Sequence, residues 1–434
     1  MTTARLRSAR GSLSGSCRVP GDKSISHRAA LLAAIAAGDS RIRGFSTAGD
    51  CATTVAVLRR LGVAVVRRGG DLYIGGRGVE RLCSPAGPLD CGRSGTTMRL
   101  LAGVLAGARF RSVLSGEDQL RRRPMGRVAD PLSRMGARVR TGPAGTAPIT
   151  IEGAALHGID YVMPVASAQV KSAILLAGLQ ATGGTTVVEA VATRDHTERL
   201  LRAMGASPEV TCGHADGAVR TSIAAAALEP VDVEVPGDFS SAAPLIVAAT
   251  LLPGSDVVVA DVGLNPSRTG LLRILERMGA AVEIEPGPPN PEPRGRIRVR
   301  PAQLTATTVT AAEVPALIDE LPLVGLLGAC AEGRTEVHGA AELRAKESDR
   351  IAGLVSGLRA LGAVAEELPD GFAVHGPVTL GGGRCDAAGD HRLAMTFAVA
   401  GLIASGPVHL EGSRWVADSF PTFFETLRRL GAAG

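Results

Sequence analysis

Residues 271–284 read LLRILERMGAAVEI and pass from an amphipathic segment through Met-Gly into a short apolar segment. A glycine at such a point is typical of a helix end, where a left-handed residue is commonly needed. The β-branched residues that follow indicate a strand. The same pattern occurs five more times, as AVLRRLGVAVV, ADPLSRMGARV, ERLLRAMGASPEV, LVSGLRALGAVAEEL and FETLRRLGAAG.

Each of these amphipathic segments follows a second, more apolar segment of helical length. The six apolar segments are HRAALLAAIAAG, SGTTMRLLAGVLAG, SAQVKSAILLAGLQATG, FSSAAPLIVAATLLPG, DELPLVGLLGACAEG and HRLAMTFAVAGLIASG. β-branched segments come after them, so one repeat holds two helices and several strands. The terminal glycines of the six repeats are Gly62, Gly136, Gly205, Gly279, Gly362 and Gly431, which lie 69 to 83 residues apart.

A repeat of this kind cannot bury its apolar faces alone, so the copies must pack together. The apolar helices are expected inside and the amphipathic helices outside. Six repeats divide into two groups of three, and 434 residues suffice for two cores. We therefore expect an α/β chain of two domains, with a joint near Glu234–Asp238.

The composition argues against several classes of protein. The seven cysteines contain no Cys-x-x-Cys pair, which argues against a disulfide framework or a zinc knuckle. The first residues lack the apolar core of a secretory signal, and no apolar run has the length of a membrane span. A cytoplasmic location is expected. The net charge of +5 fits small anionic ligands at least as well as nucleic acid, because the arginines are dispersed and aromatic residues make up only 3%.

Polar residues gather where the apolar helices are expected to begin. Helix N-termini present free N–H groups and favour anions, and added Lys and Arg point to phosphate or carboxylate ligands. Ordinary capping accounts for Ser94, Thr96 and Ser240 but not for the longer side chains. The residues at these places are Lys23, Ser24 and Arg28, then Arg93–Thr97, Ser167–Lys171, Asp319 with Glu320, and His391 with Arg392.

Further charges stand in the expected turns before the outer helices. In Arg194–Glu198 the spacing does not present metal ligands to one point, so a metal site is rejected. Asn265–Arg268 is interpreted as the start of a helix. Lys346 and Arg350 are four residues apart and are expected on one helical face.

These motifs together resemble the 5-enolpyruvylshikimate-3-phosphate synthases from about Ser12 to Leu430. The resemblance implies two domains of three repeats, each an inverse half-barrel, with the active site in the cleft between them. The implied boundaries are 1–19 plus 238–434 for domain I and 20–237 for domain II. The matching motifs are PGDKSISHR, SGTTMRL, RRRPMGRV, ASAQVKSA, TRDHTE, PGDFSSAA, IDELP, KESDR and GDHRLAM.

The implied reaction transfers the enolpyruvyl group of phosphoenolpyruvate to the 5-hydroxyl of shikimate 3-phosphate in the shikimate pathway of aromatic amino-acid biosynthesis. Asp319 matches the family's base, with Lys346 beside it, and Lys23 and Glu347 are the acid candidates. Shikimate 3-phosphate is expected at Lys23, Ser24, Arg28, Ser167, Gln169, Arg194, Asp319 and Lys346. Phosphoenolpyruvate is expected at Lys23, Gly95, Arg123, Gln169, Arg350 and Arg392. No metal and no cofactor are implied, the inhibitor glyphosate is expected to bind, and the chain is expected to be a monomer without nucleic-acid or membrane partners.

Arg93, Ala168 and Asp418 depart from patterns common in the family, and Leu100 stands where many glyphosate-sensitive members have proline. Two other functions stay open at this point. An enolpyruvyl transferase acting on UDP-N-acetylglucosamine shares the chemistry, although that family has Asn after its lysine and a cysteine in the loop matching Arg121–Arg127. A non-catalytic anion- or nucleic-acid-binding protein would have no use for the carboxylates Asp319, Glu320 and Glu347.

Overall fold

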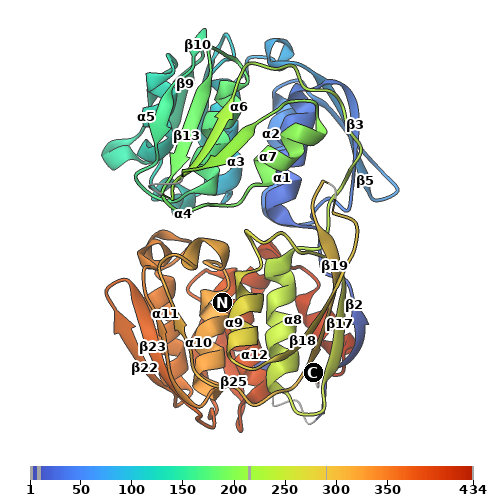
Figure 1. Cartoon of the computed structure of the whole chain (residues 1–434), viewed down its shortest axis with the longest axis vertical. Helices are drawn as coiled ribbons and strands as arrows, with labels where there is room; N and C mark the ends of the chain where they lie inside the picture. Colours follow the sequence, from blue (N-terminus) through green and yellow to red (C-terminus); the bar gives the residue numbers. More distant parts are fainter. Residues whose placement is uncertain (1–2, 7–10, 214–216, 290, 433–434) are drawn as a thin grey trace. The chain divides into compact units, whose positions relative to one another are not determined.

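The computed structural model describes residues 3–6, 11–213, 217–289 and 291–432. They form two compact units (Figure 1). Unit 1 comprises Met1–Pro20 and Pro236–Gly434, and unit 2 comprises Gly21–Val235. The first boundary lies one residue later than the sequence indicated, and the second lies two residues earlier. The backbone explains this, because the N–H of Asp238 donates to the Pro20 carbonyl and that of Gly237 to the Asp261 carbonyl, both within unit 1.

The six apolar helices are present and interior, as predicted. Their residues are buried almost all round, since apolar side chains cover every face. In unit 1 the three helices contact one another. The six helices are α1 (Lys23–Ile35), α3 (Gly95–Leu105) and α6 (Ala168–Gly178) in unit 2, and α8 (Phe239–Leu251), α10 (Leu321–Cys330) and α12 (His391–Ile403) in unit 1.

Six amphipathic helices accompany them and end at the predicted glycines. All six glycines have positive φ, between 85° at Gly62 and 110° at Gly136, which is the left-handed conformation expected at a helix end. These helices are α2 (Gly49–Arg60), α5 (Gly126–Arg134), α7 (His196–Ala203), α9 (Gly270–Arg277), α11 (Arg350–Ala360) and α13 (Phe423–Arg429). A short helix, α4 (Asp118–Arg121), lies outside the repeat plan.

Each repeat also contributes one sheet with a shared plan. One edge strand pairs parallel with its neighbour, and the remaining pairs are antiparallel. In unit 2 the orders are β16 (Val233–Glu234), β3 (Ala37–Arg43), β5 (Asp71–Arg77), β4 (Ala64–Arg68); β6 (Leu89–Asp90), β7 (Arg111–Ser115), β9 (Ile149–Glu152), β8 (Arg138–Arg140); and β11 (Asp160–Val162), β13 (Thr185–Glu189), β15 (Val219–Ile223), β14 (Glu209–Cys212). A small parallel pair joins β10 (Leu156–His157) to β12 (Ala181–Thr182).

The sheets of unit 1 follow the same plan and include the two N-terminal strands. The parallel neighbour of β17 (Asp256–Gly263) is β2 (Ser14–Cys17), and β1 (Thr3–Leu6) pairs antiparallel with β25 (Val408–Glu411). Residues from both ends of the chain therefore share one hydrophobic core. The orders are β2 (Ser14–Cys17), β17 (Asp256–Gly263), β19 (Arg294–Arg300), β18 (Ala281–Pro286); β20 (Thr308–Val309), β21 (Gly333–Val337), β23 (Gly371–Gly376), β22 (Val364–Leu368); and β24 (Gly383–Asp386), β25 (Val408–Glu411), β1 (Thr3–Leu6).

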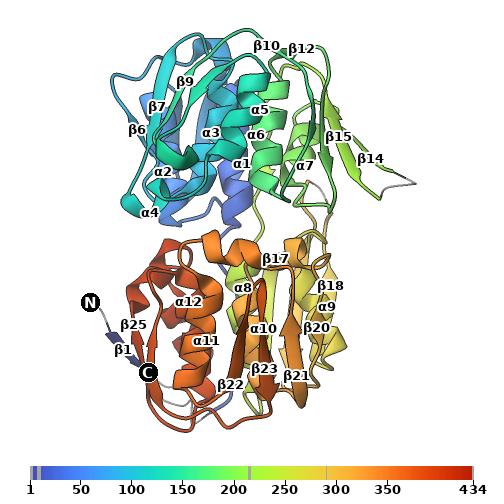
Figure 2. The same cartoon turned by 90° about the vertical axis from the view of Figure 1, so that its left-hand side faces the viewer.

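Within unit 2 the helices α3 and α6 run side by side (Figure 2). Gly103 permits this, because a Cβ there would lie 2.2 Å from the carbonyl oxygen of Ala173. Among the described helices none is both long and apolar enough to cross a membrane.

Candidate functional site

The N-termini of α1, α3 and α6 carry the predicted ligands of unit 2. Each start is fixed by a cap: Asp22 accepts from the N–H of Ile25 at 2.8 Å, Ser94 from that of Thr97 and Ser167 from that of Val170. The caps place Lys23, Gly95 and Gln169 in the first turns of the three helices. Positive helix ends and polar side chains thus gather on one unit, as an anion site requires.

Lys23 is held by a carboxylate that the sequence analysis did not single out. Its Nζ lies 3.0 Å from Oδ2 of Asp50, which stands in the first turn of α2. Both side chains are mostly buried, so the ion pair fixes the ammonium group at the start of α1. Asp50 could not be predicted as the partner of Lys23, because it lies 22 residues after the end of the motif PGDKSISHR and no local sequence pattern connects it to that motif.

Arg28 is buried and directs its guanidinium at protein groups. Its Nε donates to Thr197 Oγ1 at 2.8 Å, Nη2 to Ser172 Oγ at 2.8 Å and Nη1 to the carbonyl of Ser24 at 3.0 Å. Arg28 therefore joins α1 to α6 and α7. Next to it, Nη1 of Arg194 lies 3.5 Å from Ser24 Oγ, which brings two predicted ligands together.

Gln169 is oriented by Arg99, which was missed from the sequence. Nη1 of Arg99 donates to Oε1 of Gln169, and Nε2 of Gln169 donates to Thr96 Oγ1 at 2.8 Å. These bonds fix the orientation of the Gln169 amide, with its oxygen toward Arg99 and its nitrogen toward Thr96. A lone arginine inside the apolar helix 94–107 was the available signal, since burying a charge is costly without a partner.

Gly95 lies against two arginines. A Cβ added at this glycine would stand 3.0 Å from Nη1 of Arg123 and 3.1 Å from Nη1 of Arg99. The missing side chain therefore lets both guanidinium groups approach the start of α3. The structure thus places Gly95 beside Arg123 and beside Arg99, and Arg99 in turn contacts Gln169.

A buried ion cluster supports the turn that carries Arg194. Nζ of Lys171, whose side chain is 2% exposed, lies 2.8 Å from Glu189 and 2.7 Å from Glu198. Burial alone would lower the pKa of Lys171, but the carboxylates of Glu198 and Glu189 raise it above its ordinary value. Because Glu189 and Glu198 stand at the two ends of the turn, Lys171 fixes the path of the chain between them.

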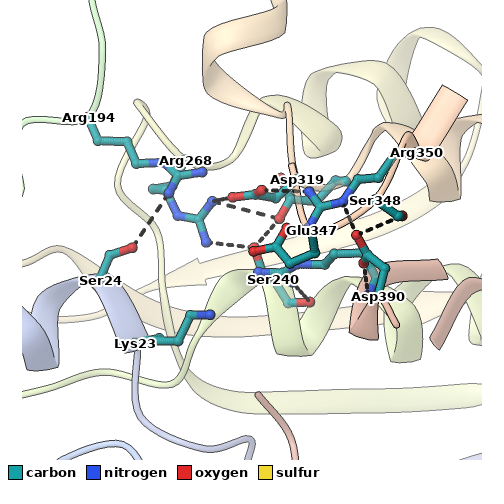
Figure 3. Close-up of polar contacts among 12 residues, drawn as sticks. Lys23, Ser24, Arg194, Ser240, Arg268, Asp319, Glu347, Ser348, Arg350 and Asp390 are labelled. Carbon is teal, nitrogen blue, oxygen red and sulfur yellow. Dashed lines mark hydrogen bonds and ion pairs between the residues drawn. The ribbon is translucent and has the colours of Figure 1, made fainter. Parts of the chain in front are cut away.

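In unit 1 the centre of the polar cluster is Arg350 (Figure 3). Its side chain is 1% exposed and contacts Glu347 at 2.6 Å, Asp390 at 2.7 Å and Asp319 at 3.1 Å. Burial disfavours the charged guanidinium, but Asp390, Glu347 and Asp319 outweigh this and raise the pKa of Arg350 above its ordinary value. Asp319, the predicted base, and Glu347, one of the acid candidates, thus both contact the buried guanidinium of Arg350.

One local prediction about this cluster is confirmed and another is wrong. Asp319 and Glu320 stand at the start of the fifth apolar helix as expected, because α10 begins at Leu321 with Glu320 at its N-cap position, where it makes no side-chain cap bond. Lys346 does not share a helical face with Arg350, because Asp349 caps α11 and the helix begins only at Arg350. Asp319 is therefore not a helix cap, and its carboxylate is turned to arginines.

Arg392 and Asp390 complete the cluster at the start of α12. Asp390 caps this helix by accepting from the N–H of Arg392 at 2.7 Å, while Nη1 of Arg392 donates to the carbonyl of Ser240 at 3.1 Å. Ser240 also donates to Glu320. The starts of α8, α10 and α12 are thereby tied together.

The arrangement suits chemistry on anions. Each unit presents buried or half-buried cations at helix N-termini, and unit 1 adds carboxylates that can exchange protons. Within the described residues, no group of three or more His, Cys, Asp or Glu side chains is placed to hold a metal ion.

Comparisons with known proteins agree with this chemistry. The family model described as EPSP synthase (3-phosphoshikimate 1-carboxyvinyltransferase) matches residues 8–427. The 3-phosphoshikimate 1-carboxyvinyltransferase of Halorhodospira halophila is 50% identical over 429 residues, covering 97% of this chain and 94% of the relative. An EPSP synthase structure from Acinetobacter baumannii superposes with a TM-score of 0.87 at 41% identity, covering 99% of this chain and 98% of that one. The enolpyruvyl transferase NikO from Streptomyces tendae shares the fold, with a TM-score of 0.81 at 21% identity over 99% of this chain and 98% of its own.

Proposed function

The chain belongs to the EPSP synthase family, and we propose how its residues carry out the family's reaction. The enzyme transfers the enolpyruvyl group of phosphoenolpyruvate to the 5-hydroxyl of shikimate 3-phosphate and releases phosphate, in the shikimate pathway. Family membership favours this acceptor over UDP-N-acetylglucosamine. Both substrates are anions, which accounts for the cations at the helix starts.

Each substrate is assigned its own set of residues. Phosphoenolpyruvate binds Lys23, Gly95, Arg123, Gln169, Arg350 and Arg392. Shikimate 3-phosphate binds Lys23, Ser24, Arg28, Ser167, Gln169, Arg194, Asp319 and Lys346. The close approach of Arg123 to Gly95, and of Arg194 to Ser24, supports these assignments. Arginine pairs well with carboxylate and phosphate oxygens because its donors form a planar fork.

The chemistry proceeds by addition and elimination. Asp319 takes the proton of the 5-hydroxyl as its oxygen bonds to C2 of phosphoenolpyruvate, and Lys23 or Glu347 donates a proton to the methylene carbon. The tetrahedral intermediate then loses a proton from that carbon, the double bond re-forms, and phosphate leaves as its C–O bond breaks. Arginines stabilise the charge that develops on the leaving phosphate.

The observation that carries this assignment is the shared contact of Asp319 and Glu347 with buried Arg350. Replacing Asp319 by Asn keeps the size of the side chain but removes the base. We expect kcat to fall by roughly 10²–10⁴-fold while the protein stays folded.

Asp256→Asn is the matched control, because Asp256 in β17 also pairs with an arginine, Arg298, at 2.6 Å. It should lower kcat by less than about twofold, as expected for a half-exposed carboxylate that pairs with Arg298 and Arg300, neither of which is proposed to bind substrate. Turnover of Asp319→Asn within a few-fold of the parent would remove Asp319 from the mechanism. The monomeric state and the cytoplasmic location stay predictions from the sequence.

A further inference from the structure

Arg268 is a buried arginine that was not among the predicted site residues. It is 3% exposed and lies in the turn between β17 and α9, in the motif that the sequence analysis interpreted only as a helix start. The turn is well fixed, because Asn265 accepts from the N–H of Ser267 at 3.0 Å and donates to Glu292 at 3.0 Å. Arg268 therefore extends from a rigid base.

The guanidinium of Arg268 faces the starts of two apolar helices. At α8, Nη2 lies 2.6 Å from Ser240 Oγ and 3.3 Å from Oδ1 of Asp238. Before α10, Nη1 lies 3.7 Å from Oε1 of Glu320 and 3.8 Å from Oδ2 of Asp319. One cation thus faces three carboxylates that would otherwise face one another.

Asp319 lies between two arginines (Figure 3). Arg350 donates to its Oδ1 at 3.1 Å, and Arg268 faces its Oδ2 at 3.8 Å, beyond direct hydrogen-bond distance. Arg350 holds one oxygen, while Arg268 acts on the other through charge. Two cations, one near each oxygen, favour the ionised form of this carboxylate.

We propose that Arg268 is a positioning residue that orients the Asp319 carboxylate and keeps it ionised for proton abstraction, an inference that rests on the proposed role of Asp319. Without Arg268, the neighbouring carboxylates of Glu320 and Asp238 would repel Asp319, which would then keep its proton to higher pH. Further charges around this group include Arg350, which contacts Asp319 directly, and Glu347 and Asp390, which contact Arg350. The guanidinium of Arg392 donates to the carbonyl of Ser240 beside them.

The test is a double-mutant cycle of Arg268→Gln and Asp319→Asn, with kcat measured against pH for each protein. We expect Arg268→Gln to lower kcat at neutral pH by about 10²-fold and to move the acid limb up by about one pH unit. In the Asp319→Asn background the same change should cost less than about threefold, because Arg268 acts through Asp319. The KM values for both substrates should stay within about threefold.

Arg298→Gln, which breaks the pair with Asp256, is the matched control and should leave the pH profile in place. Arg268→Lys should restore most of the pH profile, since it keeps the charge. Additive losses in the cycle, or an unchanged acid limb in folded Arg268→Gln, would overturn the inference while leaving the role of Asp319 intact. An unchanged kcat in Asp319→Asn alone would instead overturn the proposed base. Should Arg268→Gln fail to fold, the cycle is run with Arg268→Met, which also removes the charge, and additive losses there are equally decisive.

Discussion

His27 shows at the scale of one residue how the helix starts of unit 2 are joined. Its Nδ1 lies 2.7 Å from Thr54 Oγ1, which lies 2.7 Å from Thr97 Oγ1, and Thr97 donates to the cap residue Ser94. A buried chain of hydrogen bonds thus links α1, α2 and α3. The imidazole and the two threonine hydroxyls thus satisfy one another's hydrogen-bonding groups inside the unit.

The environment of His27 makes stability depend on pH. Burial, together with nearby Lys23 and Arg28 and against the opposite influence of Asp50, lowers the pKa of His27 to about 3 from 6.5. In the unfolded chain His27 takes up a proton below pH 6.5, but in the folded chain it does not. Stability should therefore fall as pH decreases from 6.5 toward 3, by at most ~1.4 kcal/mol per pH unit.

The measurement is the melting temperature of the wild type and of His27→Gln between pH 8 and pH 4.5, with each variant compared to its own value at pH 8. We expect a shallower decline in His27→Gln, because this side chain does not titrate. Parallel curves would show that His27 is not responsible for the acid sensitivity.

Gly95 bears on glyphosate, an inhibitor that resembles phosphoenolpyruvate. In Gly95→Ala the new methyl group would lie about 3 Å from the guanidinium of Arg123, so the arginine or the ligand must move. We expect the wild type to be inhibited competitively with phosphoenolpyruvate. In Gly95→Ala the inhibition constant and the KM for phosphoenolpyruvate should rise by about tenfold or more.

Shikimate 3-phosphate affinity is the internal control for Gly95→Ala and should change by less than about threefold. A wild type that resists glyphosate, or a Gly95→Ala variant with unchanged inhibition, would contradict this account of the phosphoenolpyruvate site.

The sequence predicted the positions of some site residues and not of others. Lys23, Gly95 and Arg350 stand in motifs that repeat or match a family, so their place could be inferred. Asp50 could not, because its role depends on an ion pair with Lys23, which lies on another helix. For Arg99 the sequence shows only an arginine inside an apolar helix and not its partner Gln169. A contact between residues that are distant in the sequence cannot be predicted from a local pattern.

At the scale of elements, α3 and α6 approach so closely that only glycine fits at one point of contact between them. A Cβ at Gly103 of α3 would come within 2.2 Å of a backbone oxygen of α6, which no rotamer change can relieve. Gly103→Ala should therefore lower the free energy of unfolding by about 1–3 kcal/mol and displace the helix starts that carry Gly95 and Gln169. The melting temperature and the KM for phosphoenolpyruvate report the two effects.

Gly49→Ala is the control, since nothing lies within 4 Å of the Cβ it would add at the start of α2. Its melting temperature should stay the same or rise, as expected for Gly→Ala in an open helical position. A Gly103→Ala variant as stable as this control would mean that α3 and α6 pack less tightly than described.

Elements were predictable where the pattern is local and repeated. The apolar helices and the left-handed glycines follow from periodicity, as Gly62 and Gly136 show. The helix start near Lys346 was placed wrongly because Asp349 caps α11 later than spacing alone suggested. Capping is decided by one side chain, which periodicity does not reveal.

At the scale of the whole molecule, the two units differ in continuity. Unit 2 is one segment, Gly21–Val235, with its own core. Unit 1 needs residues from both ends of the chain, because β2 pairs with β17. This non-local pairing was implied by the family resemblance and not by the repeat pattern, which treats every repeat alike.

A fragment of residues 21–235 should accordingly fold alone, with a cooperative thermal transition. A fragment of residues 236–434 should not, because it lacks β2 and buried Leu13. Circular dichroism and thermal melts of both fragments check this. A disordered 21–235 fragment, or a cooperative 236–434 fragment, would contradict the division into units.

The most direct measurement is the reaction of the purified full-length chain with shikimate 3-phosphate and phosphoenolpyruvate in the presence of EDTA. We predict one phosphate released per shikimate 3-phosphate consumed, with the enolpyruvyl ether at the 5-oxygen identified by NMR. Omitting either substrate should abolish phosphate release. No turnover with this pair, or turnover only when UDP-N-acetylglucosamine replaces shikimate 3-phosphate, would contradict the proposed function.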